Sequence, residues 1–389
     1  MHSEQPLKIG LLLDDSLDRP DGVQQYVLAL GAWLTAQGHT VHYLAPSTQR
    51  TDLPNLHSIG RTMSVQFNGN RLGTPWPASR RTIRKLVWQL DLDVLHVMAP
   101  YSPLLSGRVI KAASRHAQKP ALIGSFMIYP ESRLVTIGAK LLGLIQRRQL
   151  KQFDDFIAIS EAAQDFAKTA FHCETKVIGV PVNLKSFSPP AVEEPSLDGV
   201  SKPRGTSILF LGRLVPRKGA AELVEALGQL KASQPDLNWQ AVIAGKGQLL
   251  QLLQHRAKEL KIADQIEFPG FIAESDKAAL LSSADIIALP ATGGESFGIS
   301  VVEALAAATG VVLAGDNPGY RTVMRGLETQ LIDPKNTNQF AETLSQWATE
   351  IANPKTRAQI TQAQQAAAAR FDTPTIGAKI EAVYRRVLS

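Results

Sequence analysis

The stretch "SILFLGRLVPRKGAAEL", from Ser207 to Leu223, decides the fold of this chain. Its first part, SILFLG, is a short run of apolar residues of the kind found in buried strands. The next part, GRLVPRKG, has the Gly, Pro and charged residues of a loop, and AAEL begins a helix. A strand that leads through a short loop into a helix is the repeating unit of a parallel sheet covered by helices.

The same alternation of strand and helix patterns extends in both directions. Further β-rich runs lie at 8–13, 41–45, 93–98, 121–126, 155–160, 176–181, 239–245, 266–270, 285–290 and 311–315. The pattern breaks at 186–205, where Pro, Ser and charged residues predict a linker. We therefore expect two Rossmann-like, doubly wound α/β domains, over 1–185 and 206–374. Because such sheets bind ligands beyond the carboxyl ends of their strands, the two domains should face a central cleft.

Composition sets limits on compartment and partners. The chain has 389 residues, 44% hydrophobic and 20% charged, which suits a folded protein with two cores. Cys173 is its single cysteine, and the chain starts without a basic and apolar leader, so we expect a cytoplasmic protein. No run of about 20 apolar residues predicts a membrane span. The net charge of +6 favours anionic partners such as nucleotide phosphates, lipid headgroups or nucleic acid.

The loop within the opening stretch could bind an anion. Gly212 and Gly219 permit close approach of the backbone, Arg213 and Lys218 supply positive charge, and the following helix offers free N–H groups. A solvated basic turn is the alternative, and this loop alone does not decide between the two.

A second loop, "GGESFGISVVEAL" at 293–305, holds two carboxylates eight residues apart, Glu295 and Glu303. A helix should start at Phe297 and Gly298, so the N–H groups of Phe297, Gly298 and Ile299 would face a phosphate. Were the spacing helical throughout, the acids would lie about 12 Å apart, roughly the reach from a nucleotide's ribose to its attached sugar. Alternatively, Glu295 favours the helix dipole and Glu303 is solvated. The apolar neighbours of Glu303 argue against its full exposure.

These two loops, together with "IAGKGQ" at 243–248, resemble those of the family 4 glycosyltransferases of the GT-B fold. The similarity runs along nearly the whole chain, and the phosphatidylinositol mannosyltransferase group is the one it most resembles. In the first half it is carried by "DGVQQYVLALGAWLTAQGHTVHYLAP" at 21–46, "FNGN" at 67–70 and "SRRTIRKLVWQL" at 79–90.

The resemblance implies roles for individual residues. Arg213 and Lys218 would bind the diphosphate of a nucleotide-sugar donor and stabilise the departing nucleotide, Glu295 would contact the transferred sugar and Glu303 the ribose. Gly22, which begins a helix after Asp21, would reach the diphosphate from the first domain. The base or nearby phosphate would meet Gly245, Lys246 and Ile272. The resemblance also implies that the anomeric configuration is retained by front-face attack without a metal, and that the final helix, 375–389, packs back on the first domain.

The acceptor side departs from the family. Relatives commonly have a His-x-His pair where this chain has His96 and then Met98, and Met127 replaces another frequent histidine. His96 alternates with apolar residues in a strand, which predicts a packed core position. The substitutions make the floor of the site more apolar and leave the sugar and acceptor open. Asn68 and Arg71 are the other acceptor candidates.

The segment at 79–90 predicts an amphipathic helix. One stripe, Ile83, Leu86, Val87 and Leu90, suits the core, while the other consists of Arg81, Arg84, Lys85 and Trp88. The second stripe is either a solvated basic face or, as we prefer with lipid acceptors in mind, a surface that docks on an anionic membrane. The segment "GLIQRRQLKQF" at 143–153 would extend it.

Together these features predict a retaining, peripheral membrane glycosyltransferase at the inner face of the membrane, which moves a hexose such as mannose from GDP-mannose to a lipid or inositol-type acceptor. No cofactor or metal is expected, because no clustered Asp/His pattern is present. An inactive nucleotide- or membrane-binding scaffold is the alternative. A nicotinamide-dependent dehydrogenase is disfavoured, since the loop after the first strand reads DDSLDRPDG rather than Gly-x-Gly-x-x-Gly. Nucleic-acid binding is disfavoured because its motifs are missing.

Overall fold

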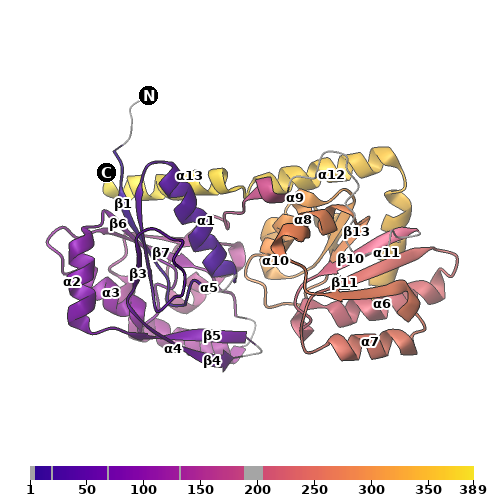
Figure 1. Cartoon of the computed structure of the whole chain (residues 1–389), viewed down its shortest axis with the longest axis horizontal. Helices are drawn as coiled ribbons and strands as arrows, with labels where there is room; N and C mark the ends of the chain where they lie inside the picture. The colour runs from indigo at the N-terminus through magenta and orange to yellow at the C-terminus, as the bar shows by residue number, and fades with distance from the viewer. Residues whose placement is uncertain (1–4, 19–20, 68–69, 131–132, 188–204) are drawn as a thin grey trace. The chain divides into compact units, whose positions relative to one another are not determined.

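The computed structural model of the chain describes residues 5–18, 21–67, 70–130, 133–187 and 205–389. They form two compact units (Figure 1). Unit 1 comprises Met1–Val182 and Thr373–Ser389, and unit 2 comprises Asn183–Asp372. The linker expected at 186–205 falls largely on 188–204, outside the described residues, and stays a prediction.

Unit 1 is built on a parallel sheet with strand order β3-β2-β1-β6-β7-β8-β9. Its strands are β1 (Lys8–Leu12), β2 (Thr40–Ala45), β3 (Leu56–Ser58), β6 (Val94–Val97), β7 (Ala121–Phe126), β8 (Asp155–Ala158) and β9 (Lys176–Val177). Its helices are α1 (Gly22–Ala36), α2 (Arg80–Leu90), α3 (Leu105–Ala113), α4 (Arg133–Leu150), α5 (Glu161–Phe171) and α13 (Thr373–Leu388). A separate antiparallel pair, not foreseen from the sequence, consists of β4 (Gly60–Phe67) and β5 (Asn70–Pro77).

Unit 2 has a parallel sheet with strand order β12-β11-β10-β13-β14-β15. The strands are β10 (Thr206–Leu211), β11 (Trp239–Ala244), β12 (Ile266–Gly270), β13 (Ile286–Leu289), β14 (Val311–Gly315) and β15 (Leu331–Ile332). The helices are α6 (Ala220–Ser233), α7 (Leu250–Glu259), α8 (Glu274–Ser282), α9 (Ile299–Ala307), α10 (Pro318–Val323), α11 (Thr337–Glu350) and α12 (Pro354–Ala369). Short 3-10 turns are η1 (Leu184–Phe187), η2 (Pro216–Lys218), η3 (Ala263–Gln265) and η4 (Glu328–Gln330).

Both sheets have the strand order of a doubly wound fold, so the predicted fold class is confirmed. In each sheet the order reverses beside the first strand. The reversal lies between β1 and β6 in unit 1 and between β10 and β13 in unit 2. In doubly wound folds, ligands bind at the carboxyl edge of the sheet beside this reversal. The loops singled out in the sequence follow β1, β6, β10 and β13.

The final helix, α13, packs against α1 on one face of the sheet of unit 1, and α2 to α5 form the layer on the other face. His96 joins α13 to the sheet. Its Nδ1 lies 2.6 Å from Tyr384 Oη and its Nε2 lies 2.6 Å from Ser125 Oγ. All three residues are fully buried, which confirms the predicted core position of His96. Burial lowers the pKa of His96 to about 3, so the ring is neutral at neutral pH.

We expect Tyr384→Phe to lower the free energy of unfolding of the chain by about 1 to 3 kcal/mol. The change removes one hydroxyl from a packed ring and leaves a buried nitrogen of His96 without its partner. Chemical denaturation followed by circular dichroism measures the loss. An unchanged midpoint would show that the hydrogen bond does not hold α13 in place.

Among the described residues, no helix is both long and apolar enough to cross a membrane.

Candidate functional site

The loops after β10 and β13 meet at the switch point of unit 2. We call them the basic loop (residues 212–219) and the acidic loop (residues 290–298). They touch at Gly219, which has a φ of 77° and where a Cβ would lie 1.8 Å from the carbonyl oxygen of Pro290. The N–H of Thr292 also donates to the carbonyl of Arg217 at 3.0 Å. The two loops are therefore held together by their backbones, and glycine is required at position 219.

The carboxylate of Glu295 lies between two cations of the basic loop. Lys218 Nζ is 2.8 Å from Glu295 Oε1, and Arg217 Nη1 contacts the same oxygen. Arg217 Nη1 also donates to the carbonyl of Gly294 at 3.2 Å. Only 11% of the Glu295 side chain is exposed, so these charges interact in a partly dehydrated place. The structure thus brings together Lys218 and Glu295, both predicted site residues.

Glu303 is buried in the middle of α9, as its apolar neighbours predicted, with 6% of the residue exposed. Its Oε2 lies 3.0 Å from Lys277 Nζ, which also contacts Glu274 Oε1 at 3.1 Å. Burial raises the pKa of Glu303, and Lys277 opposes the shift. Burial alone would lower the pKa of Lys277, but Glu303 and Glu274 outweigh it and the pKa is raised. The alternative of a solvated Glu303 is wrong.

The helix start predicted at Phe297 and Gly298 is confirmed, because α9 begins at Ile299 with Gly298 in the capping position. Phe297 is buried and packs edge-on against Phe371 at 5.1 Å between ring centroids. The first N–H groups of any helix lack intrahelical acceptors, so those at the start of α9 suit an anion. The helical spacing assumed between Glu295 and Glu303 is wrong, since only Ile299–Ala307 is helical.

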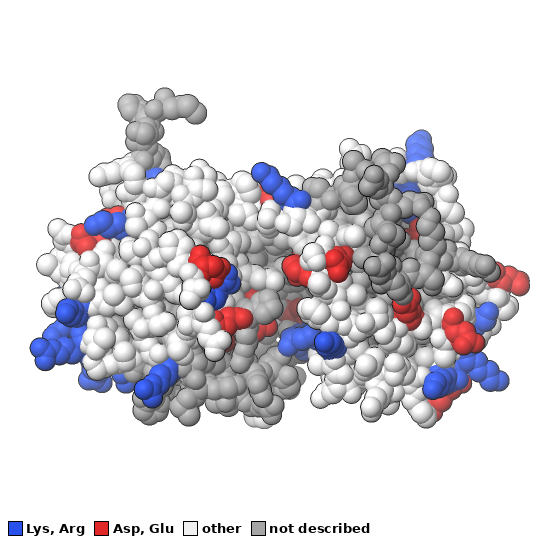
Figure 2. Space-filling view, in the orientation of Figure 1, with Lys and Arg blue, Asp and Glu red and all other residues white. Residues whose placement is uncertain are grey.

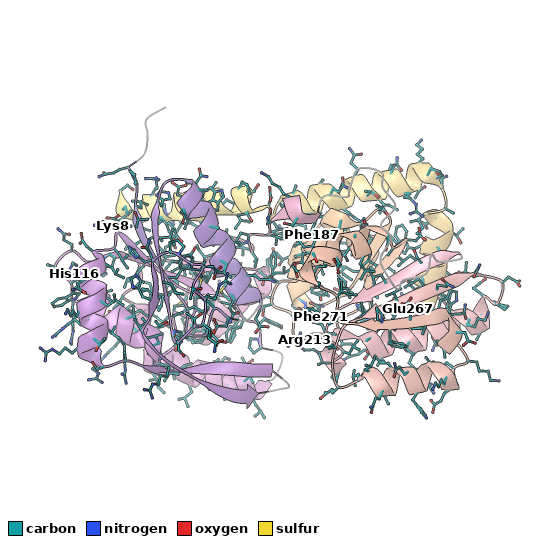
Figure 3. All side chains as sticks on the ribbon, viewed as in Figure 1. Lys8, His116, Phe187, Arg213, Glu267 and Phe271 are labelled. Atoms are coloured by element: carbon teal, nitrogen blue, oxygen red, sulfur yellow. The ribbon has the colours of Figure 1, made fainter. Side chains whose placement is uncertain are left out.

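The loops after β11 and β12 close the basic loop on its other side. The N–H of Gly212 donates to the carbonyl of Ala244 at 3.0 Å, and that of Leu214 donates to Lys246 at 2.9 Å. Gly245 donates in turn to Gly270 at 2.6 Å, and Ile272 is partly buried. The ammonium of Lys246 lies 5.3 Å from the ring centroid of Phe271, which is 67% exposed. Figure 3 shows Arg213 and Phe271 at the same end of unit 2.

In unit 1, Gly22 begins α1 as predicted, and Asp21 occupies the capping position without a side-chain hydrogen bond to the helix. Asp14, in the loop after β1, accepts a hydrogen bond from the Ser106 N–H at 2.8 Å and ties this loop to α3. Burial raises the pKa of Asp14, and the hydrogen bonds oppose the shift.

The structure describes only some of the acceptor candidates. Met98 and Met127 are 2% and 5% exposed, so both belong to the interior of unit 1. Asn68 lies outside the described residues, and so does the side chain of Arg71.

The predicted two faces of α2 are confirmed. Ile83 and Val87 are buried, with Leu86 and Leu90 packed beside them. The other stripe, which consists of Arg81, Arg84, Lys85 and Trp88, is exposed. Figure 2 shows a group of Lys and Arg side chains on the surface at α2, and the cations of this stripe are part of that group. Trp88 is fixed by the hydrogen bond of its Nε1 to the carbonyl of Ala112 at 3.1 Å, and the Arg84 guanidinium lies 5.3 Å from its ring.

Two cations of the site were missed from the sequence. Arg217 stands directly before Lys218, so the basic loop itself contained the signal. Lys277 is 26 residues before Glu303 and could have been found only by asking which cation neutralises a buried acid. The described residues contain no group of three or more His, Cys, Asp or Glu side chains arranged to hold a metal ion.

Models of two glycosyltransferase domains match this chain. The model of the "Glycosyltransferase Family 4" domain matches residues 20–186, and that of "Glycosyl transferases group 1" matches residues 198–366. The phosphatidyl-myo-inositol mannosyltransferase of Mycobacterium tuberculosis is 33% identical over 98% of this chain and 97% of its own.

Solved structures share the fold at lower identity. A glycosyltransferase of Rickettsia africae superposes with a TM-score of 0.75 at 17% identity, over 99% of this chain and 100% of the other. Anabaena HepE, in complex with UDP and glucose, does so with a TM-score of 0.67 at 18% identity, over 97% of this chain and 99% of the other.

Proposed function

Because the chain belongs to the family 4 glycosyltransferases and has their GT-B fold, we propose that it moves mannose from GDP-mannose to an inositol-type lipid at a membrane surface. The observation that carries the proposal is the junction of the basic and acidic loops at the switch point of unit 2. There, Lys218 and Glu295 lie within 2.8 Å of each other beside the start of α9. Cations and a helix N-terminus suit the binding of a diphosphate, and a carboxylate suits the hydroxyl groups of the attached sugar.

The donor would extend along the carboxyl edge of the sheet of unit 2. Its ribose would bind Glu303, displacing Lys277 from that carboxylate, and its diphosphate would bind Arg213, Lys218 and the first N–H groups of α9. Gly22, at the start of α1, is proposed from the family resemblance as a further contact of the diphosphate. The transferred sugar would bind Glu295. Lys246 and Ile272 lie beside the exposed ring of Phe271, at the edge where the base would sit.

The chemistry would depend on stabilising the departing diphosphate. In a retaining transfer by front-face attack, the bond between the anomeric carbon and the diphosphate oxygen breaks. The acceptor hydroxyl adds from the same side of the sugar and passes its proton to the departing diphosphate. The positive charges of Lys218 and Arg213 would stabilise the negative charge that develops on the leaving group. Arg217 would hold Glu295 in place when Lys218 turns to the phosphate. On this proposal no metal ion is needed, because the cations supply the charge.

The acceptor is proposed from the relatives, whose names state phosphatidyl-myo-inositol as their substrate. The exposed stripe of α2 would hold the enzyme on anionic lipid at the inner face of the membrane, with Trp88 at the level of the headgroups. Met98 and Met127 would form an apolar floor under the sugar and acceptor.

Incubation of the pure chain with a panel of nucleotide sugars and vesicles that contain phosphatidylinositol tests the function. We expect release of GDP from GDP-mannose and a mannosylated lipid detected by mass spectrometry. A donor panel that includes UDP-glucose and GDP-glucose separates recognition of the base from recognition of the sugar. If no donor yields a glycolipid, although the protein binds GDP, the chain is a nucleotide-binding scaffold and the proposal is wrong.

A further inference from the structure

Helix α4 has an apolar face that no described residue covers. Its exposed fractions are 80% for Leu134, 63% for Ile137, 60% for Leu141 and 66% each for Leu144 and Ile145. We call these five residues the outer stripe. Their spacing of three, four, three and one residues places them along one side of a helix. Contiguous exposed apolar surface of this kind marks a site of interaction in a folded protein.

The opposite face of α4 already packs against unit 1. Ala139, Leu142 and Leu150 join the core formed with α5. Gly143 lies so close to α5 that a Cβ there would be 2.3 Å from the carbonyl oxygen of Ala170. The helix is therefore apolar on two sides, and only one of them is used for folding. A helix of this composition is usually surrounded by protein or lipid.

The charges of α4 indicate which partner fits. The helix contains no Asp or Glu, while Lys140, Arg147 and Arg148 are exposed cations. Lys140 and Arg147 are seven residues apart and so lie on one edge of the outer stripe. An apolar stripe edged by cations is the pattern of a helix that lies in the interface of an anionic membrane. Two copies of the chain paired stripe to stripe about a twofold axis would bring these cations together without a carboxylate from α4.

We propose that the outer stripe inserts into the acyl boundary of an anionic bilayer while Lys140 and Arg147 contact the headgroups. This inference deepens the proposed function and rests on it for the membrane. It adds a hydrophobic anchor to the electrostatic contact of α2. The two elements belong to one layer, since α3 contacts both α2 and α4. A cationic surface alone is released by salt, whereas inserted apolar side chains are not.

The test compares binding to vesicles of phosphatidylcholine mixed with phosphatidylglycerol, by flotation at low and high salt. We expect Leu141→Gln combined with Leu144→Gln to weaken binding by about tenfold or more at both salt concentrations, because two leucines no longer leave water. Arg81→Gln combined with Lys85→Gln should weaken binding at low salt only. The matched control is Leu252→Gln, the same change at a residue of unit 2 that is 58% exposed, and it should bind as the wild type does.

A second measurement detects insertion directly. In Leu144→Trp the new indole should shift its emission to the blue with vesicles and be quenched by lipids brominated on their acyl chains. Wild-type affinity in the double glutamine variant, or no quenching of the new tryptophan, overturns the inference. The inference is also overturned if the wild type sediments as a dimer and the glutamine variant as a monomer, while both bind vesicles equally well.

Failure of the proposed function is distinguishable from failure of this inference. Transfer to a short-chain acceptor in detergent does not require an intact bilayer. The glutamine variant should therefore keep that activity while it loses vesicle binding. A chain without any transferase activity would still support the inference if its vesicle binding depends on the outer stripe.

Discussion

Lys218→Ala should lower kcat for sugar transfer by about a hundred- to a thousandfold. Lys218, in the basic loop, lies 2.8 Å from Glu295, and only 17% of its side chain is exposed. A cation held in such a place is already oriented toward the diphosphate. Its removal takes away stabilisation of the leaving group, and water cannot replace that stabilisation. The affinity for GDP should change much less, because Arg213 and the N-terminus of α9 remain.

Steady-state kinetics and isothermal titration of GDP separate these two effects. Lys355→Ala, which removes an exposed cation at the start of α12, is the control for the loss of positive charge. Unchanged turnover of Lys218→Ala would contradict the assigned role. A loss of GDP affinity as large as the loss of kcat would show instead that Lys218 stabilises the bound nucleotide and the transition state equally.

Glu303→Ala should weaken GDP binding by about a hundredfold. Two hydrogen bonds from a ribose diol to a charged carboxylate contribute about this much when water is excluded. The 6% exposure of Glu303 indicates that water has little access to it. Removing the carboxylate also leaves Lys277 with only Glu274, whose side chain is 70% exposed and therefore a weaker partner.

The ribose assignment can be tested with 2′-deoxy-GDP. If Glu303 holds the diol, the wild type should discriminate between GDP and the deoxy analogue, and Glu303→Ala should lose most of that discrimination. Equal discrimination in both proteins would refute the contact. Glu342→Ala removes an exposed carboxylate of α11 and should bind GDP normally. A cycle with Lys277→Ala separates loss of the ribose contact from the cost of an unpaired lysine.

The sequence predicted the fold because strand and helix patterns alternate with few interruptions, and strand order then follows the rules for parallel sheets. It also predicted local burial, since the apolar neighbours of His96 and Glu303 leave little room for water. The partners of these residues could not be predicted. Tyr384 lies 288 residues after His96, and Lys277 is on a different helix from Glu303. The hydrophobic pattern of one segment does not show which distant residue will contact it.

Helical periodicity left two features of the chain unpredicted. The distance between Glu295 and Glu303 was taken from helical rise, but glycines at 293, 294 and 298 keep the chain out of the helix until Ile299. The segment "GLIQRRQLKQF" was expected only to extend the basic surface of 79–90, and the exposure of its Leu144 and Ile145 was not predicted. Periodicity shows that a helix has an apolar side and leaves open whether protein covers it.

The pairing of Glu295 with Lys218 and Arg217, and of Glu303 with Lys277, means that the proposed donor site contains its own counter-ions. Arrival of a diphosphate is then an exchange of anions at Lys218 rather than the filling of a bare positive surface. A lone sulfate or phosphate must compete with a tethered carboxylate and gains little. On the proposed function, a complete nucleotide sugar would offer hydroxyl groups to both carboxylates, so the site would favour the whole substrate over its fragments.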